Sequence, residues 1–173
     1  MRDIHEAFRE AGKLHGHYCP GLAIGVRAAC EAENILGIDC RGRKDLFCIY
    51  ESSACYLDGI QWVFNTSLGK GNIISHPTGK TAFSFYDSVT GKSVRLYLRP
   101  AKNEMSREEM QEHILTAPLE ELFEVGETRL PCPERSHGSS VKAVCPICGE
   151  TAAEDKMVMR DGRLLCADCA GKE

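Results

Sequence analysis

Residues able to bind a metal ion or to act as nucleophiles are concentrated in one short stretch near the start of the chain, His15 to Gly21, with the sequence HGHYCPG. Two imidazoles and one thiol precede Pro20 and an apolar run. Proline is favoured at the first position of a helix, so Cys19 is expected at a helix N-terminus, where free backbone N–H groups and the helix dipole favour a thiolate. The pattern therefore predicts a metal ligand or a reactive sulfur.

Cys55 is a second cysteine with the same predicted electrostatic setting. It follows an apolar run, residues 46–50, that is typical of a buried strand. Ser52 or Ser53 is expected to cap a short helix and so place Cys55 in the first helical turn. Cys19 and Cys55 would then both lie near positive helix ends, and we interpret them as two halves of one site.

Four cysteines near the C-terminus form the most specific motif of the sequence. Cys145 and Cys148 make one C-x-x-C unit and Cys166 and Cys169 make another, with 17 residues between them. This spacing is typical of structural zinc sites with four cysteine ligands, which leave no coordination position open. Two disulfides or a tetrahedral iron site are the alternatives. A tail this short cannot form its own core, so the metal would supply its folding energy.

Other cysteines and two lysines carry weaker signals. Cys30, Cys40 and Cys48 have no nearby ligand partner and are interpreted as small buried hydrophobic residues. The segment from Gly79 onward resembles the end of a phosphate-binding loop, but the earlier glycine of that motif is absent and a strand is expected to follow, so nucleotide binding is rejected. Lys70 and Lys80 could line an anionic pocket, although a solvated lysine beside a glycine turn is the commoner case.

The hydrophobic periodicity of the sequence predicts the helices and strands that position these residues. Helices are expected over residues 3–14 and 21–36, and a hairpin with alternating arms is expected over 81–86 and 93–98. A capping box at Ser106 begins a further helix, and a short helical turn and a last strand, 123–125, follow. This order predicts an α+β fold, with N-terminal helices packed on a mainly antiparallel sheet.

The composition divides the chain into two domains. Residues 131–143 lack apolar periodicity and are rich in proline, glycine and serine near their start, so they are expected to form a linker. The sequence thus predicts a core domain over 1–130 and a four-cysteine domain over 144–173.

The overall composition excludes several classes of protein. A net charge of −4 and a pI near 5.9 argue against a general basic surface for nucleic acid. No stretch approaches the roughly 18 apolar residues of a membrane helix, and the N-terminus does not resemble a signal peptide. A cytoplasmic protein is expected, in which ten cysteines indicate metal binding or redox chemistry before disulfides.

Several motifs in the first 125 residues occur together in one known family. They are His15-Gly16-His17-Tyr18-Cys19-Pro20-Gly21 with Gly25 and Arg27, Cys55-x-x-Asp58-x-Ile60-Gln61, Gly69-Lys70-Gly71-Asn72 and Gly79-Lys80. In these motifs the chain resembles the E-subunit family of formylmethanofuran dehydrogenase, and its four-cysteine tail resembles the treble-clef zinc finger that some members append.

The resemblance implies an α+β core, a homodimer and a cleft in which His17, Cys19 and Cys55 bind a metal ion, with His15 close by. The leading hypothesis is therefore a metal-binding subunit or accessory protein linked to molybdenum- or tungsten-dependent formyl or formate redox chemistry, as in methanogenesis. Its partners would be subunits of the molybdenum or tungsten enzyme. Its cofactors would be structural zinc in the tail and a second transition metal, zinc or another ion, in the core. Three protein ligands would leave one position open, so the same three residues are the candidate catalytic residues.

Two hypotheses from other classes remain. In one, the protein is a zinc-finger module that binds a protein or a nucleic acid, although bases are outnumbered by acids from residue 144 onward, which disfavours nucleic acid. In the other, it is a thiol redox protein in which Cys19 and Cys55 form a reversible disulfide.

Overall fold

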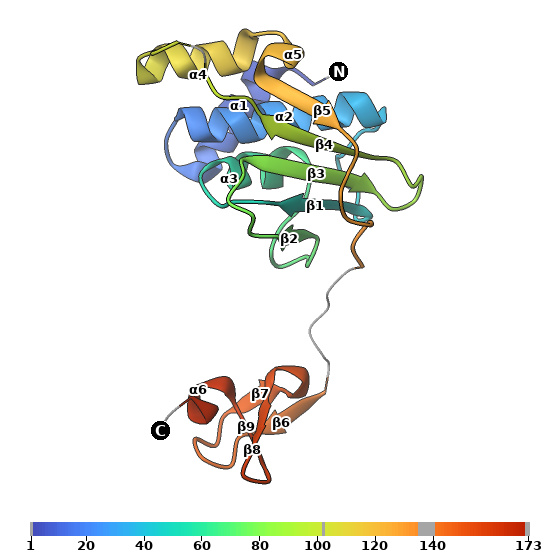
Figure 1. The fold of residues 1–173 in the computed structure, drawn as a ribbon, viewed down its shortest axis with the longest axis vertical. Coiled ribbons are helices and arrows are strands. Elements are labelled where there is room, and N and C mark those ends of the chain that lie inside the picture. The colour runs from blue at the N-terminus through green and yellow to red at the C-terminus, as the bar shows by residue number, and fades with distance from the viewer. Residues whose placement is uncertain (1, 102, 135–140, 172–173) are drawn as a thin grey trace. The chain divides into compact units, whose positions relative to one another are not determined.

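A computed structural model of the protein describes residues 2–101, 103–134 and 141–171. The chain forms two compact units, Met1–Glu134 and Arg135–Glu173, which we call the core unit and the tail unit and describe separately (Figure 1). The expected linker, 131–143, includes residues 135–140, which lie outside the described residues.

Five helices belong to the core unit, and their ends follow local capping rules. The side chain of Asp3 accepts a hydrogen bond from the Glu6 N–H at the start of the first helix, and Gly16 ends that helix in the left-handed conformation. Ser106 and Glu109 form the expected capping box of the fourth helix. The helices are α1 (Ile4–His15), α2 (Pro20–Leu36), α3 (Tyr56–Val63), α4 (Arg107–Thr116) and α5 (Leu119–Leu122).

A five-stranded sheet completes the core unit, with the strand order β2-β1-β3-β4-β5. Its strands are β1 (Leu46–Tyr50), β2 (Ile73–Ser75), β3 (Ala82–Asp87), β4 (Ser93–Leu98) and β5 (Phe123–Gly126). β1 and β2 pair in parallel, whereas the other three pairs are antiparallel. The predicted α+β class with a mainly antiparallel sheet is therefore confirmed. The short parallel strand β2 was not expected, because its three residues carry too little periodicity to identify a strand.

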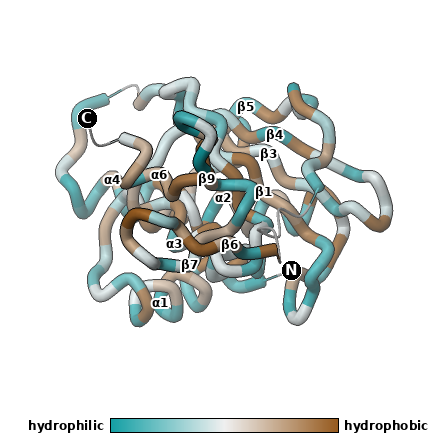
Figure 2. The backbone as a smooth tube through the Cα atoms, turned by 90° about the horizontal axis from the view of Figure 1, so that it is seen from below, coloured by the Kyte–Doolittle hydropathy of each residue, from teal (hydrophilic) through white to brown (hydrophobic). Residues whose placement is uncertain are grey.

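The helices cover one face of the sheet (Figure 1). Leu46 and Cys48 of β1 join the large hydrophobic core that includes the helices. Phe47 and Ile49 of the same strand point to the opposite face and pack with Tyr86 in a smaller cluster. Hydrophobic and hydrophilic stretches alternate along the chain, as expected for elements that each bury one face (Figure 2).

Helices α2 and α3 approach each other through glycine, and this contact sets the geometry of the candidate site. A Cβ atom added at Gly25 would lie 1.9 Å from the carbonyl oxygen of Tyr56. A Cβ atom added at Gly59 would lie 2.7 Å from the Val26 nitrogen and 2.8 Å from the Leu22 oxygen. The two backbones are therefore in direct contact, and only glycine fits at either position.

The tail unit contains β6 (Lys142–Val144), β7 (Thr151–Ala153), a 3₁₀ turn (Glu154–Lys156), β8 (Val158–Arg160), β9 (Arg163–Leu165) and α6 (Ala167–Ala170). Asp161 and Gly162 both have positive φ and form the hairpin turn that connects β8 to β9. The four cysteines of this unit gather into one cluster, as the fold prediction required.

None of the helices within the described residues is long and apolar enough to cross a membrane.

Candidate metal centres

Cys19 occupies the position that the sequence predicted for it. It is the N-cap residue of α2, Pro20 is the first helical residue, and the Cys19 sulfur accepts a hydrogen bond from the Leu22 N–H at 3.3 Å. Its side chain is buried, with 3% of the residue exposed. This hydrogen bond holds the Cys19 sulfur in place at the N-terminus of α2.

The turn between α1 and α2 carries the two histidines. His15 is the last residue of α1, and Gly16 reverses the chain with φ 85°. Tyr18 then packs on Phe8 of α1 with ring centroids 5.3 Å apart, and it lies so close to Gly12 that a Cβ there would be 2.2 Å from the Tyr18 ring. This packing fixes a turn in which the His15 and His17 rings lie 4.3 Å apart.

Cys55 lies with these residues, but its helix begins two or three residues later than a cap at Ser52 or Ser53 would require. Cys55 is itself the N-cap of α3, and neither Ser52 nor Ser53 caps the helix. The Ser52 hydroxyl is bonded instead to the carbonyl of Lys80 and to the Tyr56 hydroxyl. The expectation of a serine cap was therefore wrong, because this serine makes long-range hydrogen bonds that the local sequence does not reveal.

One donor atom from each of His15, His17, Cys19 and Cys55 lies within 4.8 Å of the other three. A tetrahedral zinc site with Zn–S bonds of about 2.3 Å has its sulfur atoms about 3.8 Å apart, so a small inward movement would let all four donors reach one ion. Gly21 leaves room for this, because a Cβ there would lie 3.8 Å from both sulfurs and 3.0 Å from the Cys55 Cβ. Two imidazoles and two thiols are donors that suit zinc and several other transition metals.

His15 has a partner that the sequence analysis did not assign. Its Nδ1 lies 2.6 Å from an Asp58 carboxylate oxygen, and its Nε2 lies 3.8 Å from the Cys19 sulfur. Gln61, one turn further along α3, is 3.4 Å from the other Asp58 oxygen. Histidines that bind metals usually donate their second N–H to a carboxylate, which fixes the ring and increases its basicity. The sequence does contain one indication of this role, because Asp58 follows Cys55 by three residues and so lies on the same face of the same helix.

Burial and the neighbouring Cys19 thiol both raise the pKa of Cys55. Two sulfurs this close resist carrying negative charge together, because each charge disfavours the other. A cation bound between them would reverse this effect and stabilise both thiolates. The electrostatics of the cluster thus match a site for a positive ion.

The tail cluster is built from local elements only. Cys145 and Cys148 follow β6 in a tight turn ended by Gly149, while Cys166 caps α6 and Cys169 lies within it. The Cys148 and Cys166 sulfurs are 3.8 Å apart. Backbone N–H groups of Cys148, Cys166 and Ile147 lower the pKa of Cys145 to about 6. A thiolate is therefore available for a metal at neutral pH.

The remaining cysteines and lysines behave largely as expected. Burial raises the pKa of Cys30 to about 12 and raises the pKa values of Cys40 and Cys48 as well, as for inert thiols in a hydrophobic core. The ammonium group of Lys70 is bonded to the Asn65 carbonyl and side chain. Lys80 lines a pocket of the core unit, and none of the residues around this pocket belongs to either cluster.

Comparisons with known proteins show which family and which fold the chain shares. The family model described as FmdE, Molybdenum formylmethanofuran dehydrogenase operon, matches residues 14–124. A probable S-adenosyl-L-methionine-binding protein of Archaeoglobus fulgidus is 28% identical, over 93% of this chain and 51% of that protein, so the chain spans about half the length of this curated relative. The crystal structure of a tungsten formylmethanofuran dehydrogenase FmdE-like protein from Syntrophus aciditrophicus has the same fold, with a TM-score of 0.70 and 24% identity over 97% of this chain and 92% of that one.

Proposed function

We propose that this chain, which belongs to the FmdE family, is a metalloprotein that works through one transition-metal ion held between α2 and α3. The ion would be bound by the Cys19 and Cys55 thiolates together with His15 and His17. The single observation that carries this proposal is the convergence of these four donors from two helix starts and one turn. The tail cluster would hold a second ion, zinc, whose role is structural.

The four donors differ in exposure, and this difference suggests how the core site would act. Cys19 is buried and the His15 side chain is only 9% exposed, whereas His17 is exposed to solvent. His17 is therefore the ligand that a substrate, a water molecule or a partner's sulfur could replace. When bound, the ion would supply Lewis-acid polarisation or exchange of this outer ligand.

Asp58 and Gln61 would keep His15 in place during such an exchange. The short contact between Asp58 and the Nδ1 atom favours the tautomer whose Nε2 lone pair faces the two sulfurs. In this arrangement the chain itself holds a proton at Nδ1 and keeps it away from the metal-binding nitrogen.

The chemical setting that we favour is formyl or formate redox metabolism dependent on molybdenum or tungsten, in which this chain serves as a subunit or accessory protein. Three large apolar side chains on the segments that carry the candidate ligands are well exposed, namely Leu14 at 63%, Tyr18 at 50% and Trp62 at 43%. A second copy of the chain or a subunit of the molybdenum or tungsten enzyme would cover them. Sedimentation of the wild type and of Trp62→Glu measures this association.

Metal analysis of cysteine variants tests the core site. Wild-type protein should contain two ions per chain, and Cys19→Ser and Cys55→Ser should each contain one. Serine is a good N-cap residue, so Cys19→Ser keeps the cap of α2 while removing the thiolate. Amide NMR signals of residues 141–171 should stay in place in both variants.

The matched control is Cys132→Ser, because Cys132 is exposed and belongs to neither cluster. It should retain both ions. Unchanged metal content in Cys19→Ser and Cys55→Ser would refute a metal function of the core site.

The proximity of Cys19 and Cys55 also supports a second candidate function, reversible disulfide formation. The two thiols would transfer two electrons and two protons to a disulfide-bearing partner. Thiol titration of metal-free protein before and after reduction distinguishes the two functions. Two titratable thiols gained on reduction, and lost in Cys55→Ser, would favour the redox function.

A further inference from the structure

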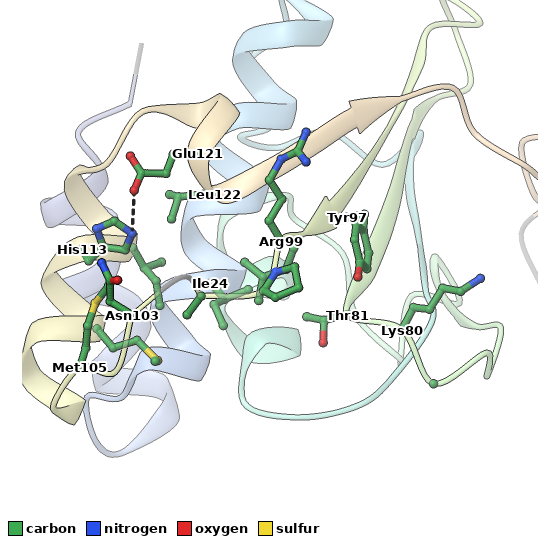
Figure 3. Close-up of a pocket in the computed structure, with 16 residues that line it drawn as sticks. Ile24, Lys80, Thr81, Tyr97, Arg99, Asn103, Met105, His113, Glu121 and Leu122 are labelled. Atoms are coloured by element: carbon green, nitrogen blue, oxygen red, sulfur yellow. Dashed lines mark ion pairs between the residues drawn. The ribbon is translucent and has the colours of Figure 1, made fainter.

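A pocket of about 530 Å³ lies in the core unit, between α2 and α4 and beside the end of β4 (Figure 3). This volume is in the range of pockets that bind small organic molecules. None of the residues that form its walls belongs to the metal clusters described above.

The middle of the pocket is apolar. Ile24 of α2, Leu98 of β4 and Met110 of α4 are partly buried against the hydrophobic core, and Leu122 forms part of the same wall. Met105 adds a second methionine. Methionine side chains are flexible and polarisable, so they adapt to apolar groups of different shapes.

The ends of the pocket are polar and carry an excess of positive charge. In Figure 3, Lys80, Thr81 and Tyr97 lie on one side of the apolar middle, and His113 lies on the other. His113 is already paired with Glu121, at 3.6 Å. Among the described residues the Lys80 ammonium group makes no direct hydrogen bond or ion pair, although its charge also acts on the Glu51 carboxylate and helps to lower the pKa of that group.

The position of Lys80 is held by two buried or partly buried groups of the preceding strand and loop. The Glu51 carbonyl accepts hydrogen bonds from the Thr78 and Gly79 N–H groups, each at 3.0 Å. The Ser52 hydroxyl donates to the Lys80 carbonyl at 2.8 Å. Lys80 is therefore set on an ordered loop next to Thr81, and its exposed side chain extends outward at this end of the pocket in Figure 3.

We propose that this pocket binds a small amphipathic organic anion, with its carboxylate at the end formed by Lys80, Thr81 and Tyr97 and its apolar body along Ile24 and Met110. Charge complementarity and the apolar middle together select this class over neutral lipids and over hydrophilic anions. Arg99 also lines the pocket, with a side chain that is 44% exposed and paired with Glu124 at 4.0 Å. The inference does not depend on a metal in the core site.

Titration of full-length protein labelled with ¹³C at the methionine methyl groups tests the proposal, with octanoate as the probe. The Met105 and Met110 signals should shift and saturate together, because both residues line the pocket. Met157 and Met159 belong to the tail unit and provide internal references that should not move. The neutral analogue octanamide should bind more weakly.

Two variants test whether Lys80 binds the carboxylate of octanoate and whether octanoate binding is independent of the core metal site. Lys80→Met should weaken octanoate binding by about two- to fivefold, the range for one exposed ion pair, and should leave octanamide binding unchanged. Cys19→Ser should bind octanoate as the wild type does, which would show that the carboxylate is not bound to a metal.

Three results would overturn the proposal. The first is the absence of shifts at Met105 and Met110 at millimolar octanoate. The second is equal binding of octanoate and octanamide in the wild type. The third is a change of the Met105 and Met110 signals on dilution without ligand, since this would show that a second copy of the chain occupies the pocket.

Discussion

The two cysteine clusters differ in where their ligands come from. All four tail ligands lie within one small unit, in two C-x-x-C turns that need only local structure to form. The four candidate ligands of the core come from the end of α1, the turn between α1 and α2, the N-cap of α2 and the N-cap of α3, and the folded core brings them together. Four identical soft ligands make a closed site, whereas two thiols and two imidazoles with unequal exposure make a site whose outer ligand can exchange.

The comparison indicates that in the tail unit folding depends on the metal, whereas in the core unit metal binding depends on the fold. The buried residues in the described part of the tail are two of its candidate ligands, Cys145 and Cys169, and Leu165, so the proposed metal would hold that unit together. The core unit has a large hydrophobic core of its own and should fold without an ion. We therefore expect metal removal, mutation and acid to affect the two units differently.

Metal removal from the tail should have the largest effect. Cys148→Ser, or treatment with a strong chelator, should unfold residues 141–171 completely, because a four-cysteine zinc site supplies about 10–16 kcal/mol in small domains. Amide NMR signals of the tail should collapse to random-coil positions, while those of the core stay in place. Cys132→Ser, which leaves both clusters intact, should change neither set of signals. A tail that remains folded after chelation would remove the contrast between the two units.

Acid should weaken the core through a buried ion pair rather than through a metal. The Glu51 carboxylate lies 2.7 Å from the Arg95 guanidinium and 2.6 Å from the Thr78 hydroxyl. Although burial opposes it, hydrogen bonds from Thr78 and Arg95 leave the pKa of Glu51 below its ordinary value of 4.5. Its stabilising contribution is therefore complete above pH 4.5 and is lost as the pH falls through the lower, folded-state pKa.

Glu51→Gln should accordingly cost about 3 kcal/mol of core stability at pH 7, because it leaves a buried arginine without its counter-charge. The difference from the wild type should shrink below pH 4.5. Urea unfolding at several pH values measures this difference in the free energy of unfolding. Asp39→Asn removes an exposed pair with Arg41 and should cost much less than Glu51→Gln does. A constant difference between Glu51→Gln and the wild type from pH 3 to pH 7 would contradict this explanation.

Gly25→Ala should disturb the core site without touching a ligand. The new methyl group would collide with the Tyr56 carbonyl and force α2 and α3 apart, at a cost of about 1–3 kcal/mol. The core ion should bind more weakly and the tail ion as before, as measured by metal content after dialysis. Gly69→Ala is the matched control, because nothing lies within 4 Å of a Cβ there. Equal metal content in the two variants would show that the helix contact does not set the site.

Asp58→Asn should have the smallest effect, a loss of metal affinity confined to the core site. Loss of a carboxylate that orients a ligand histidine lowers metal affinity by about 10- to 100-fold, so the core ion should be bound more weakly by that amount. Competition with a chromophoric chelator measures the affinity of each site. Glu10→Gln changes an exposed carboxylate on α1 and should leave both affinities unchanged. An unaltered core affinity in Asp58→Asn would exclude His15 from the ligand set.

The sequence predicted best what local spacing determines. The tail cluster, the capping box at Ser106 and the N-cap position of Cys19 all depend on residues within a few positions of one another, and all are found as expected. The assignment of His17, Cys19 and Cys55 as ligands stays a prediction, although the structure does bring them together with His15.

The features that the sequence did not predict depend on contacts between distant segments. The contact between His15 and Asp58, the bond between Ser52 and Lys80 and the parallel strand β2 each join parts of the chain far apart in sequence. The amphipathic pocket is formed by α2, α4 and the end of β4, which no single periodicity identifies. Local rules describe each element separately and cannot give the distances between elements.

The contact between Gly25 and Gly59 has a consequence for how the core site responds to temperature. Side chains change rotamers readily as a protein is warmed, so a spacing set by their packing becomes variable. Here the spacing between α2 and α3 is set by peptide groups in direct contact, which have no rotamers to change. The opening between the Cys19 and Cys55 sulfurs should thus stay nearly constant until the core unit unfolds as a whole.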